Sequence, residues 1–407
     1  MLKHPLKPFP FSDRLKSIET QTNPLTLKKE KLIRKGITIL DLTISNPTQS
    51  SFKYLDQNLL EAFQNHANLT YEPDPLGLLK ARQEIINYYA NKGVPLKPDQ
   101  IILTANTSEA YTFIFKLLMN SGDELLAPAP SYPLLDDLAH FNDVAIKRYE
   151  LQAQNDWRID LDNMNALATN RTRGMLFIHP NNPTGNYFHS SERQNLADWL
   201  TQKNLALIVD EVFLDFGLEP SYRKNTFADF KDVLTFTLSG ISKVLGLPQM
   251  KLSWIVVNGP EPLLMNALDK LSIISDTYLS VSTPAQNAFH DWMKCVDTIQ
   301  DEIRFRVSQN YARLVKEISG AKITVHTWQG GWVIPIRLPD TLDDEGWALA
   351  LLESGQVLTH PGYFYNFADG VYLVVSLLVP EKIFAEGLVR IIKIVNAVSC
   401  TSQAYNA

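Results

Sequence analysis

Through the middle of the chain, short apolar runs alternate with amphipathic stretches. Apolar runs of this length, separated by helix-like segments, are typical of a mainly parallel sheet with helices on both faces. The pattern therefore predicts an α/β fold. The predicted strands are 101–105 (IILTA), 124–128 (ELLAP), 175–180 (MLFIHP), 205–213 (LALIVDEVF), 233–240 (VLTFTLSG) and 252–259 (LSWIVVNG).

The regular alternation of predicted strands and helices ends at about residue 290. A long helical stretch (297–320) is followed by a Gly330-Gly331 turn, the apolar run 372–379 and a closing helix that starts at Pro380. Helices beside a few strands are typical of a separate α+β domain. A chain of 407 residues also exceeds what one hydrophobic core usually organises. We therefore predict a second, smaller domain.

The predicted organisation has three parts, and their limits are soft by several residues. Residues 1–50 contribute an N-terminal arm and part of the small domain, with a strand expected at 37–43 (ITILDLT). Residues 51–295 form the large domain, and residues 296–407 form the small C-terminal domain.

Charge and composition exclude several classes of protein. The formal net charge of −6 offers no attraction to nucleic acid or to an anionic membrane. The chain has no apolar stretch of about 18 residues, which a membrane-spanning helix requires, and its beginning lacks the apolar core of a signal peptide. Cys295, Cys400 and the eight histidines show no metal-ligand spacing. We therefore expect a soluble cytoplasmic protein without a metal site.

Polar side chains follow the predicted strands at the points where the strands end. Asn106, Thr107 and Ser108 stand between strand 101–105 and the helix predicted at 108–120. Backbone amides at a helix N-terminus, with two hydroxyls beside them, can hold a phosphate. Taken alone, the same three residues are an ordinary helix cap.

Three further strand ends carry matched chemistry. Tyr132, in the proline-rich loop 128–136, can offer a flat face to an aromatic ring, or it can be structural. Asn182, in the tight loop HPNNPTGN, is placed to donate a hydrogen bond. Asp210 ends an apolar run, where a carboxylate is costly unless a cation or a helix cap meets it.

Lys243 follows the strand predicted at 233–240 and is flanked by the small residues Ser239, Gly240 and Ser242. Such packing suits a lysine that reacts with a carbonyl in a crowded pocket, although an isolated lysine is more often on the surface. Together the five loops supply a phosphate cradle, a stacking face, a donor for a ring oxygen, an acid for a ring nitrogen and an amine nucleophile. Pyridoxal phosphate needs each of these groups.

The motifs NNPTG, DEVF and SGISK, in this order, resemble the class I and II aminotransferases of fold type I, the aspartate aminotransferase superfamily. The resemblance runs from about residue 40 to about residue 395. It implies a large domain with a mainly parallel seven-stranded sheet, a smaller α+β domain and pyridoxal 5'-phosphate as cofactor.

The resemblance also implies a role for each motif residue. Lys243 would hold the cofactor as a Schiff base and move the substrate proton, with Asp210 on the ring nitrogen as the second catalytic residue. Asn182 would donate to the ring hydroxyl, and Tyr132 would stack on the ring. Tyr71, in YEPDPLGLLKAR, would reach the phosphate of a neighbouring subunit, which implies a homodimer. The remaining phosphate-binding residues would be Asn106, Thr107, Ser108 and Lys251.

The chain departs from the family pattern at four positions. Phe213 replaces a tyrosine that donates to the ring oxygen, and its loss predicts a raised pKa of the Schiff base. Gly240 replaces a serine, and Lys251 replaces an arginine, near the phosphate. Val374 replaces the arginine that clamps the substrate carboxylate. Either another cation binds the carboxylate, or the amino donor has none at that site.

The function that follows is transfer of an amino group from an amino acid or amine to a 2-oxo acid by a ping-pong mechanism. One alternative is a lyase or decarboxylase on the same scaffold, for which Val374 leaves room. Another is a non-catalytic regulatory protein, against which the joint presence of Lys243, Asp210 and Asn182 argues. Trp332, Tyr363 and Tyr365 either line a pocket for a bulky apolar substrate or pack the small domain.

Overall fold

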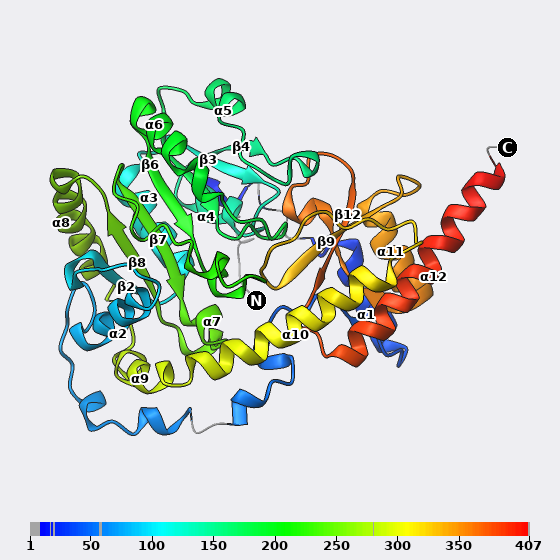
Figure 1. The fold of residues 1–407 in the computed structure, drawn as a ribbon, viewed down its shortest axis with the longest axis horizontal. Coiled ribbons are helices and arrows are strands. Elements are labelled where there is room, and N and C mark those ends of the chain that lie inside the picture. The colour runs from blue at the N-terminus through cyan, green and yellow to red at the C-terminus, as the bar shows by residue number, and fades with distance from the viewer. Residues whose placement is uncertain (1–8, 17, 19–20, 57–58, 280, 406–407) are drawn as a thin grey trace, which may run out of the picture.

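The computed structural model describes residues 9–16, 18, 21–56, 59–279 and 281–405. Its strands form a seven-stranded sheet, a three-stranded sheet and a two-stranded pair. In Figure 1 the large sheet and its helices form one lobe, and the three-stranded sheet lies in the other, beside the last helix. Short 3-10 turns make many of the connections.

The seven-stranded sheet has the order β2-β8-β7-β6-β5-β3-β4, in which only β8 runs antiparallel to its neighbours β2 and β7. The predicted fold class, with its mainly parallel seven-stranded sheet, is confirmed. The strands are β2 (Ile101–Thr104), β3 (Glu124–Ala129), β4 (Ala145–Glu150), β5 (Thr172–Ile178), β6 (Ala206–Asp210), β7 (Thr235–Gly240) and β8 (Ser253–Asn258).

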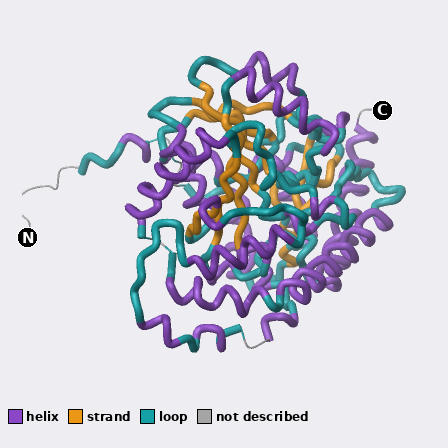
Figure 2. Tube along the Cα trace, turned by 60° about the vertical axis from the view of Figure 1, so that its left-hand side comes forward, coloured by secondary structure: helices purple, strands orange, loops and turns teal. Residues whose placement is uncertain are grey.

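Helices cover both faces of this sheet, as the central strands and flanking helices of Figure 2 show. Successive side chains of a strand point to opposite faces, so Ile208 of β6 packs in one core while Leu207 and Val209 pack in another. Burial on both sides explains why the strands read as continuous apolar runs. The helices are α2 (Leu79–Ala90), α3 (Thr107–Leu118), α4 (Leu135–Phe141), α5 (Leu161–Leu167), α6 (Arg193–Lys203), α8 (Glu261–Tyr278) and α9 (Thr283–Met293).

The edge strand β4 is absent from the strands that we located from the sequence. It pairs in parallel with β3, and its sequence AIKRYE is largely polar. Only Tyr149 within it is buried. An edge strand that faces solvent carries charged residues and shows little apolar periodicity, which explains the omission.

The C-terminal part contains the antiparallel sheet β11-β12-β9, made of His360–Pro361, Val371–Ser376 and Val333–Leu338. Helix α10 (Val296–Glu317) runs from one lobe to the other in Figure 1. Two other helices, α11 (Asp344–Gly355) and α12 (Glu381–Tyr405), contact each other in this part.

Residues near the N-terminus join this C-terminal part. Strand β1 (Leu40–Asp41) pairs with β10 (Val357–Leu358), so the strand expected over 37–43 is much shorter than predicted. Helix α1 (Pro24–Arg34) contacts α11 through an ion pair between Lys28 and Glu353. The predicted limits of the three parts remain a prediction, and residues 1–8 of the predicted arm lie outside the described residues.

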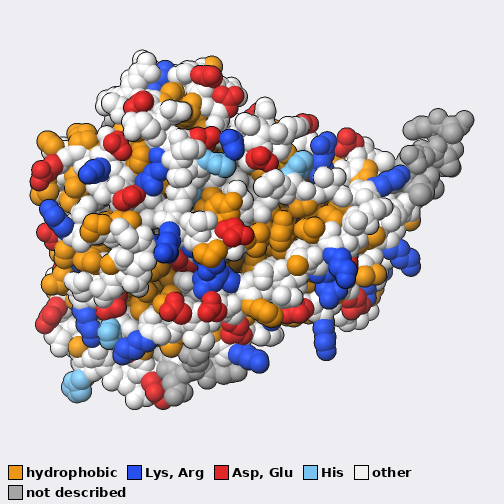
Figure 3. All heavy atoms as spheres, viewed as in Figure 1, with side chains coloured by type: hydrophobic (Ala, Val, Ile, Leu, Met, Phe, Trp, Pro, Cys, Tyr) orange, Lys and Arg blue, Asp and Glu red, His pale blue; other side chains and the backbone are white. Residues whose placement is uncertain are grey.

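The surface carries both signs of charge. On the face shown in Figure 3, lysine and arginine side chains are interspersed with aspartate and glutamate. Within the described ranges, no helix is both long enough and apolar enough to cross a membrane. Those ranges also contain no group of three or more His, Cys, Asp or Glu placed to hold a metal ion.

Candidate active site

A cavity of about 600 Å³ opens where the parallel strands β3, β5, β6 and β7 end. Loops that leave the carboxyl ends of parallel strands meet at one edge of the sheet, so residues distant in sequence converge there. The structure brings together eight of the nine predicted cofactor-binding residues and leaves Tyr71 outside. The eight that line the cavity are Asn106, Thr107, Ser108, Tyr132, Asn182, Asp210, Lys243 and Lys251.

Asp210 sits at the centre of this edge because β6 lies between β5 and β7. Its neighbours in register are Ile178 and Leu238. The side chain is 5% exposed and accepts two hydrogen bonds, from the hydroxyl of Tyr111 at 2.8 Å and the backbone amide of Val212 at 3.1 Å. Burial raises the pKa of Asp210, and these two donors and the Lys243 amine oppose the rise.

Tyr111 is a candidate functional residue that we did not single out from the sequence. It is fully buried in α3, and its hydroxyl reaches Asp210 across the sheet edge. A signal was present, because Tyr111 stands four residues after Thr107 and therefore on the same face of the helix. It is also the one hydroxyl-bearing side chain among the buried residues of α3.

The loop after β5 is held by its own side chains. The amide of Asn181 donates to the hydroxyl of Thr184 at 2.7 Å, and that hydroxyl donates to Asn186. Gly185 has a φ of +75°, and a Cβ there would lie 2.3 Å from the ring of Trp328, so only glycine fits. The loop presents Asn182 to the cavity, and its buried Oδ1 has no hydrogen-bond partner.

His179 begins this loop but does not line the cavity. Its Nδ1 accepts from the amide of Phe188 at 3.1 Å, and its Nε2 lies 2.7 Å from the carbonyl of Asn225, to which it donates. Burial lowers the pKa of His179 to about 3, so the ring is neutral. Its two hydrogen bonds hold the loop in place.

Lys243 lies in α7 (Ile241–Val244), the single turn that follows β7. Its Nζ is 5.0 Å from the ring centroid of Trp332 and 5.5 Å from that of Phe213. Burial, opposed by Asp210 and assisted by Lys251, lowers the pKa of Lys243 to about 8. The amine therefore has a much larger neutral fraction near pH 8 than an exposed lysine has, and only the neutral form is a nucleophile or base.

The sequence left open whether the N-terminus of α3 is an ordinary helix cap or a phosphate site, and its structure is compatible with both. The side chain of Asn106 is a helix cap, since its Oδ1 accepts from the amide of Glu109 at 3.0 Å. Thr107 and Ser108 form the first turn and line the cavity with it. Because the first amides of a helix have no partner within it, this end can still receive an anion.

Ser253 occupies the space that a side chain at Gly240 would need. These residues face each other across β7 and β8, and a Cβ on Gly240 would lie 2.0 Å from the Ser253 hydroxyl. Ser253 lines the cavity, so a serine hydroxyl is present there although it comes from the neighbouring strand. Lys251, two residues before Ser253, has a left-handed φ of +56°.

The side of the cavity near the three-stranded sheet is largely apolar. Val333, Phe213 and Tyr365 line it, and among the described lining residues the cations are Lys243 and Lys251. Val374 is 1% exposed, pairs in register with Pro335 and His360, and does not line the cavity.

Of the other residues that the sequence suggested near the substrate, some line the cavity and others lie outside it. Ser45 lines the cavity, whereas the Asn46 side chain caps a 3-10 turn by accepting from the amide of Thr48. Tyr363 is 45% exposed, lies outside the cavity and contacts Glu345. Trp332 is buried and covers Lys243, as described above.

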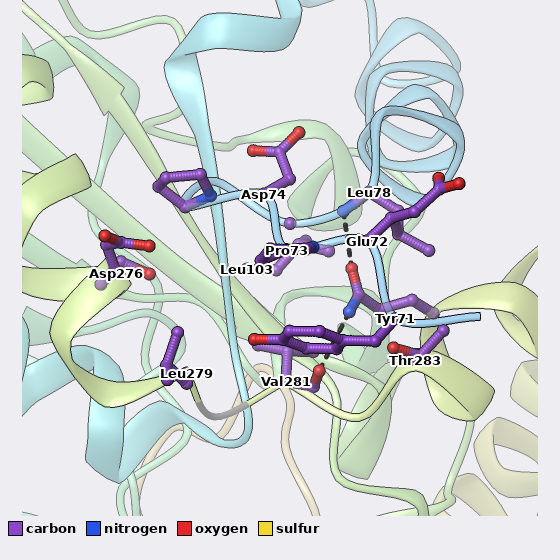
Figure 4. Close-up of a pocket in the computed structure, with 14 residues that line it drawn as sticks. Tyr71, Glu72, Pro73, Asp74, Leu78, Leu103, Asp276, Leu279, Val281 and Thr283 are labelled. Carbon is purple, nitrogen blue, oxygen red and sulfur yellow. Dashed lines mark hydrogen bonds between the residues drawn. The ribbon is translucent and has the colours of Figure 1, made fainter. Parts of the chain in front are cut away.

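Tyr71 lies in a different pocket, shown in Figure 4. Its side chain is 69% exposed and lies beside Val281 and Thr283. Leu279, which lines the same pocket, is 66% exposed. Within one chain, therefore, Tyr71 does not contribute to the cavity around Lys243.

A family model described as Aminotransferase class I and II matches residues 37–374. The glutamate-pyruvate aminotransferase AlaA of Escherichia coli (strain K12) is 28% identical over 322 residues, which cover 77% of this chain and 80% of that protein. The S-alkyl-thiohydroximate lyase SUR1 of Arabidopsis thaliana is 33% identical over 189 residues, or 46% of this chain and 40% of that protein. Among solved structures, the alanine aminotransferase from Pyrococcus furiosus matches with a TM-score of 0.85 at 26% identity, covering 95% of this chain and 100% of that one.

Proposed function

Because the chain belongs to the aminotransferase class I and II family, we propose that the cavity around Lys243 is its active site. The chain is a pyridoxal-phosphate-dependent aminotransferase of fold type I, and it transfers amino groups between amino acids and 2-oxo acids. One observation supports the location most directly: a single cavity gathers a buried carboxyl, an amide and a buried amine from three strand ends.

The donor set fits pyridoxal phosphate. Asp210 is a buried carboxyl without an ion pair among the described residues, and a protonated ring nitrogen would supply the missing cation. The Asn182 amide would donate to the ring oxygen, and Tyr132 would stack on the ring. Thr107, Ser108, Lys251 and Ser253 would hold the phosphate. When bound, the cofactor withdraws the electrons that are released at the substrate Cα.

Lys243 would act as both the attachment point and the base. Its pKa of about 8 leaves much of the amine neutral at mildly alkaline pH, so it can take a proton from the substrate Cα and return one to the cofactor. Phe213 and Trp332 cover the amine and would exclude water from the reacting atoms. Asp210 would hold the ring nitrogen protonated throughout.

The apolar side of the cavity supports an amino donor with a bulky apolar side chain. Val333, Phe213 and Tyr365 would surround such a group, and Val374 cannot supply the usual carboxylate contact. The test is a single-turnover assay in which donors are mixed with the holoenzyme and the cofactor absorption is followed. We expect phenylalanine to react at least tenfold faster than alanine or glutamate. Equal rates for the three would contradict the proposed specificity.

A lyase is the second candidate, and the partial match to SUR1 favours testing it. With a cysteine conjugate as substrate, a β-lyase would break the Cβ–S bond and release a thiol, pyruvate and ammonia, which a product assay would detect. An aminotransferase would instead pass the amino group to an added 2-oxo acid without releasing ammonia. Ammonia release without transfer would replace the first proposal with the second.

Tyr111→Phe should slow transfer by roughly 10- to 100-fold, the effect of removing a hydrogen bond to a charged group. Without this donor the pKa of Asp210 should rise further, so the carboxyl would be protonated over a wider range of pH and would hold the ring nitrogen less well. The measurement is the single-turnover rate as a function of pH. The loss should be largest at low pH, where Asp210 is most readily protonated.

Tyr149→Phe is the matched control for this variant. Tyr149, in β4, is also a fully buried tyrosine, but its hydroxyl donates to the backbone carbonyl of Leu176 at 2.8 Å. Its loss should lower stability by about 1 kcal/mol and leave the rate and the pH profile unchanged. If both variants lose the same activity, Tyr111 has only a structural role.

The pocket around Tyr71 supports a homodimer. Tyr71 and Leu279 are exposed there, and Leu69 nearby in sequence is 80% exposed. Exposed apolar side chains that lie together commonly mark an interface. In a dimer Tyr71 would reach the phosphate end of the partner's cavity, so each active site would be shared.

Sedimentation at micromolar concentration should give the mass of two chains. Leu279→Asp should shift the protein toward one chain and weaken cofactor binding at least tenfold, because Tyr71 would leave the partner's site. Val389→Asp places the same charge on an equally exposed position of α12 and serves as the control. A fully active wild-type monomer would refute the proposal.

We also propose the domain limits and the cellular location of the protein. The division at residues 50 and 295 places the cofactor-binding loops in one large domain and the apolar wall of the cavity partly in the small one. A cytoplasmic location agrees with Cys295, which forms no disulfide in the described part of the chain. Limited proteolysis and cell fractionation would test these two points.

A further inference from the structure

A second cavity, of about 430 Å³, lies against η9 (Leu214–Phe216), the short helix that follows Phe213. Its walls come from α2, α9, α10 and η10 (Tyr222–Lys224), and no residue lines both this cavity and that of Lys243. Five lysines and arginines and three acids line it. The volume falls in the range of small-molecule sites.

The buried acid of this cavity is already satisfied. Asp215 is 5% exposed at its side chain and forms an ion pair with Lys92. It also accepts from the hydroxyl of Tyr88 at 2.8 Å and from the amide of Gln300 at 3.0 Å. Another acid, Glu84, pairs with His290 at 2.8 Å. Lys294 and Arg304 pair with Asp291 and Asp301, which lie outside the lining, and Asp297 is the third acid at the cavity.

Arg223 differs from the other cations of this cavity because its guanidinium is partly buried and has no partner among the described residues. Its Nε is buried and donates no hydrogen bond, and the described residues provide it with no ion pair. The neighbouring Arg304 is committed to Asp301 and to the carbonyl of Asp215. Burial and repulsion by Arg304 lower the pKa of Arg223, while attraction to Tyr187, Asp301 and Asp215 opposes the shift, and the group stays charged. A partly buried guanidinium beside another is costly unless an anion joins them.

We propose that this cavity binds a small phosphate-bearing anion between Arg223 and Arg304. The planar fork of a guanidinium matches the oxygens of a phosphate, and two such groups with Lys224 at the rim would surround a dianion. This inference does not depend on the proposed chemistry of Lys243, because no residue of the first cavity takes part.

The second cavity is linked to the first by hydrogen bonds. Gln300 donates both to Asp215 and, at 3.1 Å, to the carbonyl of Val244, the residue after Lys243. Arg304 in turn donates to the Gln300 side-chain oxygen at 3.0 Å. An anion that draws Arg304 toward it disturbs Gln300 and, through it, the turn that carries Lys243. Occupancy of the second cavity is therefore communicated to the active site.

The binding test is calorimetric titration of inorganic phosphate into the holoenzyme at constant ionic strength. The cofactor fills the phosphate site of the first cavity, so the titration reports on a further site. Arg223→Gln should weaken binding at least tenfold, and Arg223→Lys, which keeps the charge without the fork, should weaken it less. Arg34→Gln is the control, because Arg34 is 79% exposed on α1 and pairs only with Glu30 there. No binding to the wild type, or equal binding to Arg223→Gln, would overturn the site.

The communication is tested on the cofactor spectrum. Saturating phosphate should shift the pH midpoint of the absorption band of the Lys243-bound cofactor, relative to chloride at the same ionic strength. Gln300→Met should lose the shift even at phosphate concentrations that saturate this variant, because the methionine side chain cannot bridge Asp215 and Val244. An identical midpoint with and without phosphate in the wild type would refute the communication and leave only the binding site.

Discussion

Lys243→Ala is expected to lower amino-group transfer by at least about three orders of magnitude and to remove covalent attachment of the cofactor. The reason is chemical as well as geometric. The amine is the buried nucleophile of the cavity, with a pKa of about 8, and Asp210 is the ionisable group that opposes the lowering of that pKa. Alanine offers neither a nucleophile for the cofactor carbonyl nor a base for the substrate proton.

The measurement combines absorption with peptide mapping. Wild-type protein reconstituted with pyridoxal phosphate is reduced with borohydride, and the modified peptide should carry the phosphopyridoxyl mass on Lys243. Lys251→Ala is the matched control, because Lys251 is the other lysine that lines the cavity. That variant should keep the label on Lys243 and bind the cofactor more weakly. A label on another lysine, or full activity of Lys243→Ala, would refute the assignment.

The arrangement of these residues was predictable because it follows from the topology of a parallel sheet. Asp210, Asn182 and Lys243 each follow an apolar run, and the ends of parallel strands necessarily meet at one edge. The predicted strands lie in the sheet for the same reason, since residues buried on both faces leave a continuous apolar signal.

The features that escaped prediction depend on contacts between distant segments. Strand β4 carries charged residues because it is an edge, so its pairing with β3 leaves no apolar pattern. Ser253 takes the space beside Gly240 through the register of β7 and β8, which no local pattern reports. The bond from Tyr111 to Asp210 likewise joins α3 to the end of β6. Such pairs become visible only when the sheet is assembled.

The sequence at position 374 indicates what is missing there but not where the side chain lies. The sequence indicates the loss of a carboxylate clamp, and the structure adds that the valine is buried between β9 and β11. Replacing it with arginine would bury a charge without a described partner, which is costly. The proposed apolar donor specificity therefore rests on the residues that do line the cavity, such as Val333 and Tyr365.

Asp210→Asn is the second large effect that we expect, a fall of about 10²- to 10³-fold in the single-turnover rate. Asparagine keeps the size of the side chain and can still accept from Tyr111 and Val212, so the fold should persist. It carries no charge, however, and cannot stabilise a protonated ring nitrogen. The cofactor should therefore still attach to Lys243 while the electrons at the substrate Cα lose their acceptor.

Glu211→Gln is the control that separates charge at the ring from the loss of any buried carboxyl. Glu211 is the next residue, and it is equally buried, but it accepts from the hydroxyl of Thr226 at 2.6 Å and from the amide of Phe227, and it does not line the cavity. Burial raises the pKa of Glu211 to about 8, so at pH 7 the group is mostly protonated and the amide mimics its native state. Its transfer rate at pH 7 should equal that of the wild type. If Asp210→Asn kept a rate within tenfold of the wild type while Glu211→Gln lost activity, the carboxyl that serves the cofactor would be Glu211, and the site as proposed here would be wrong.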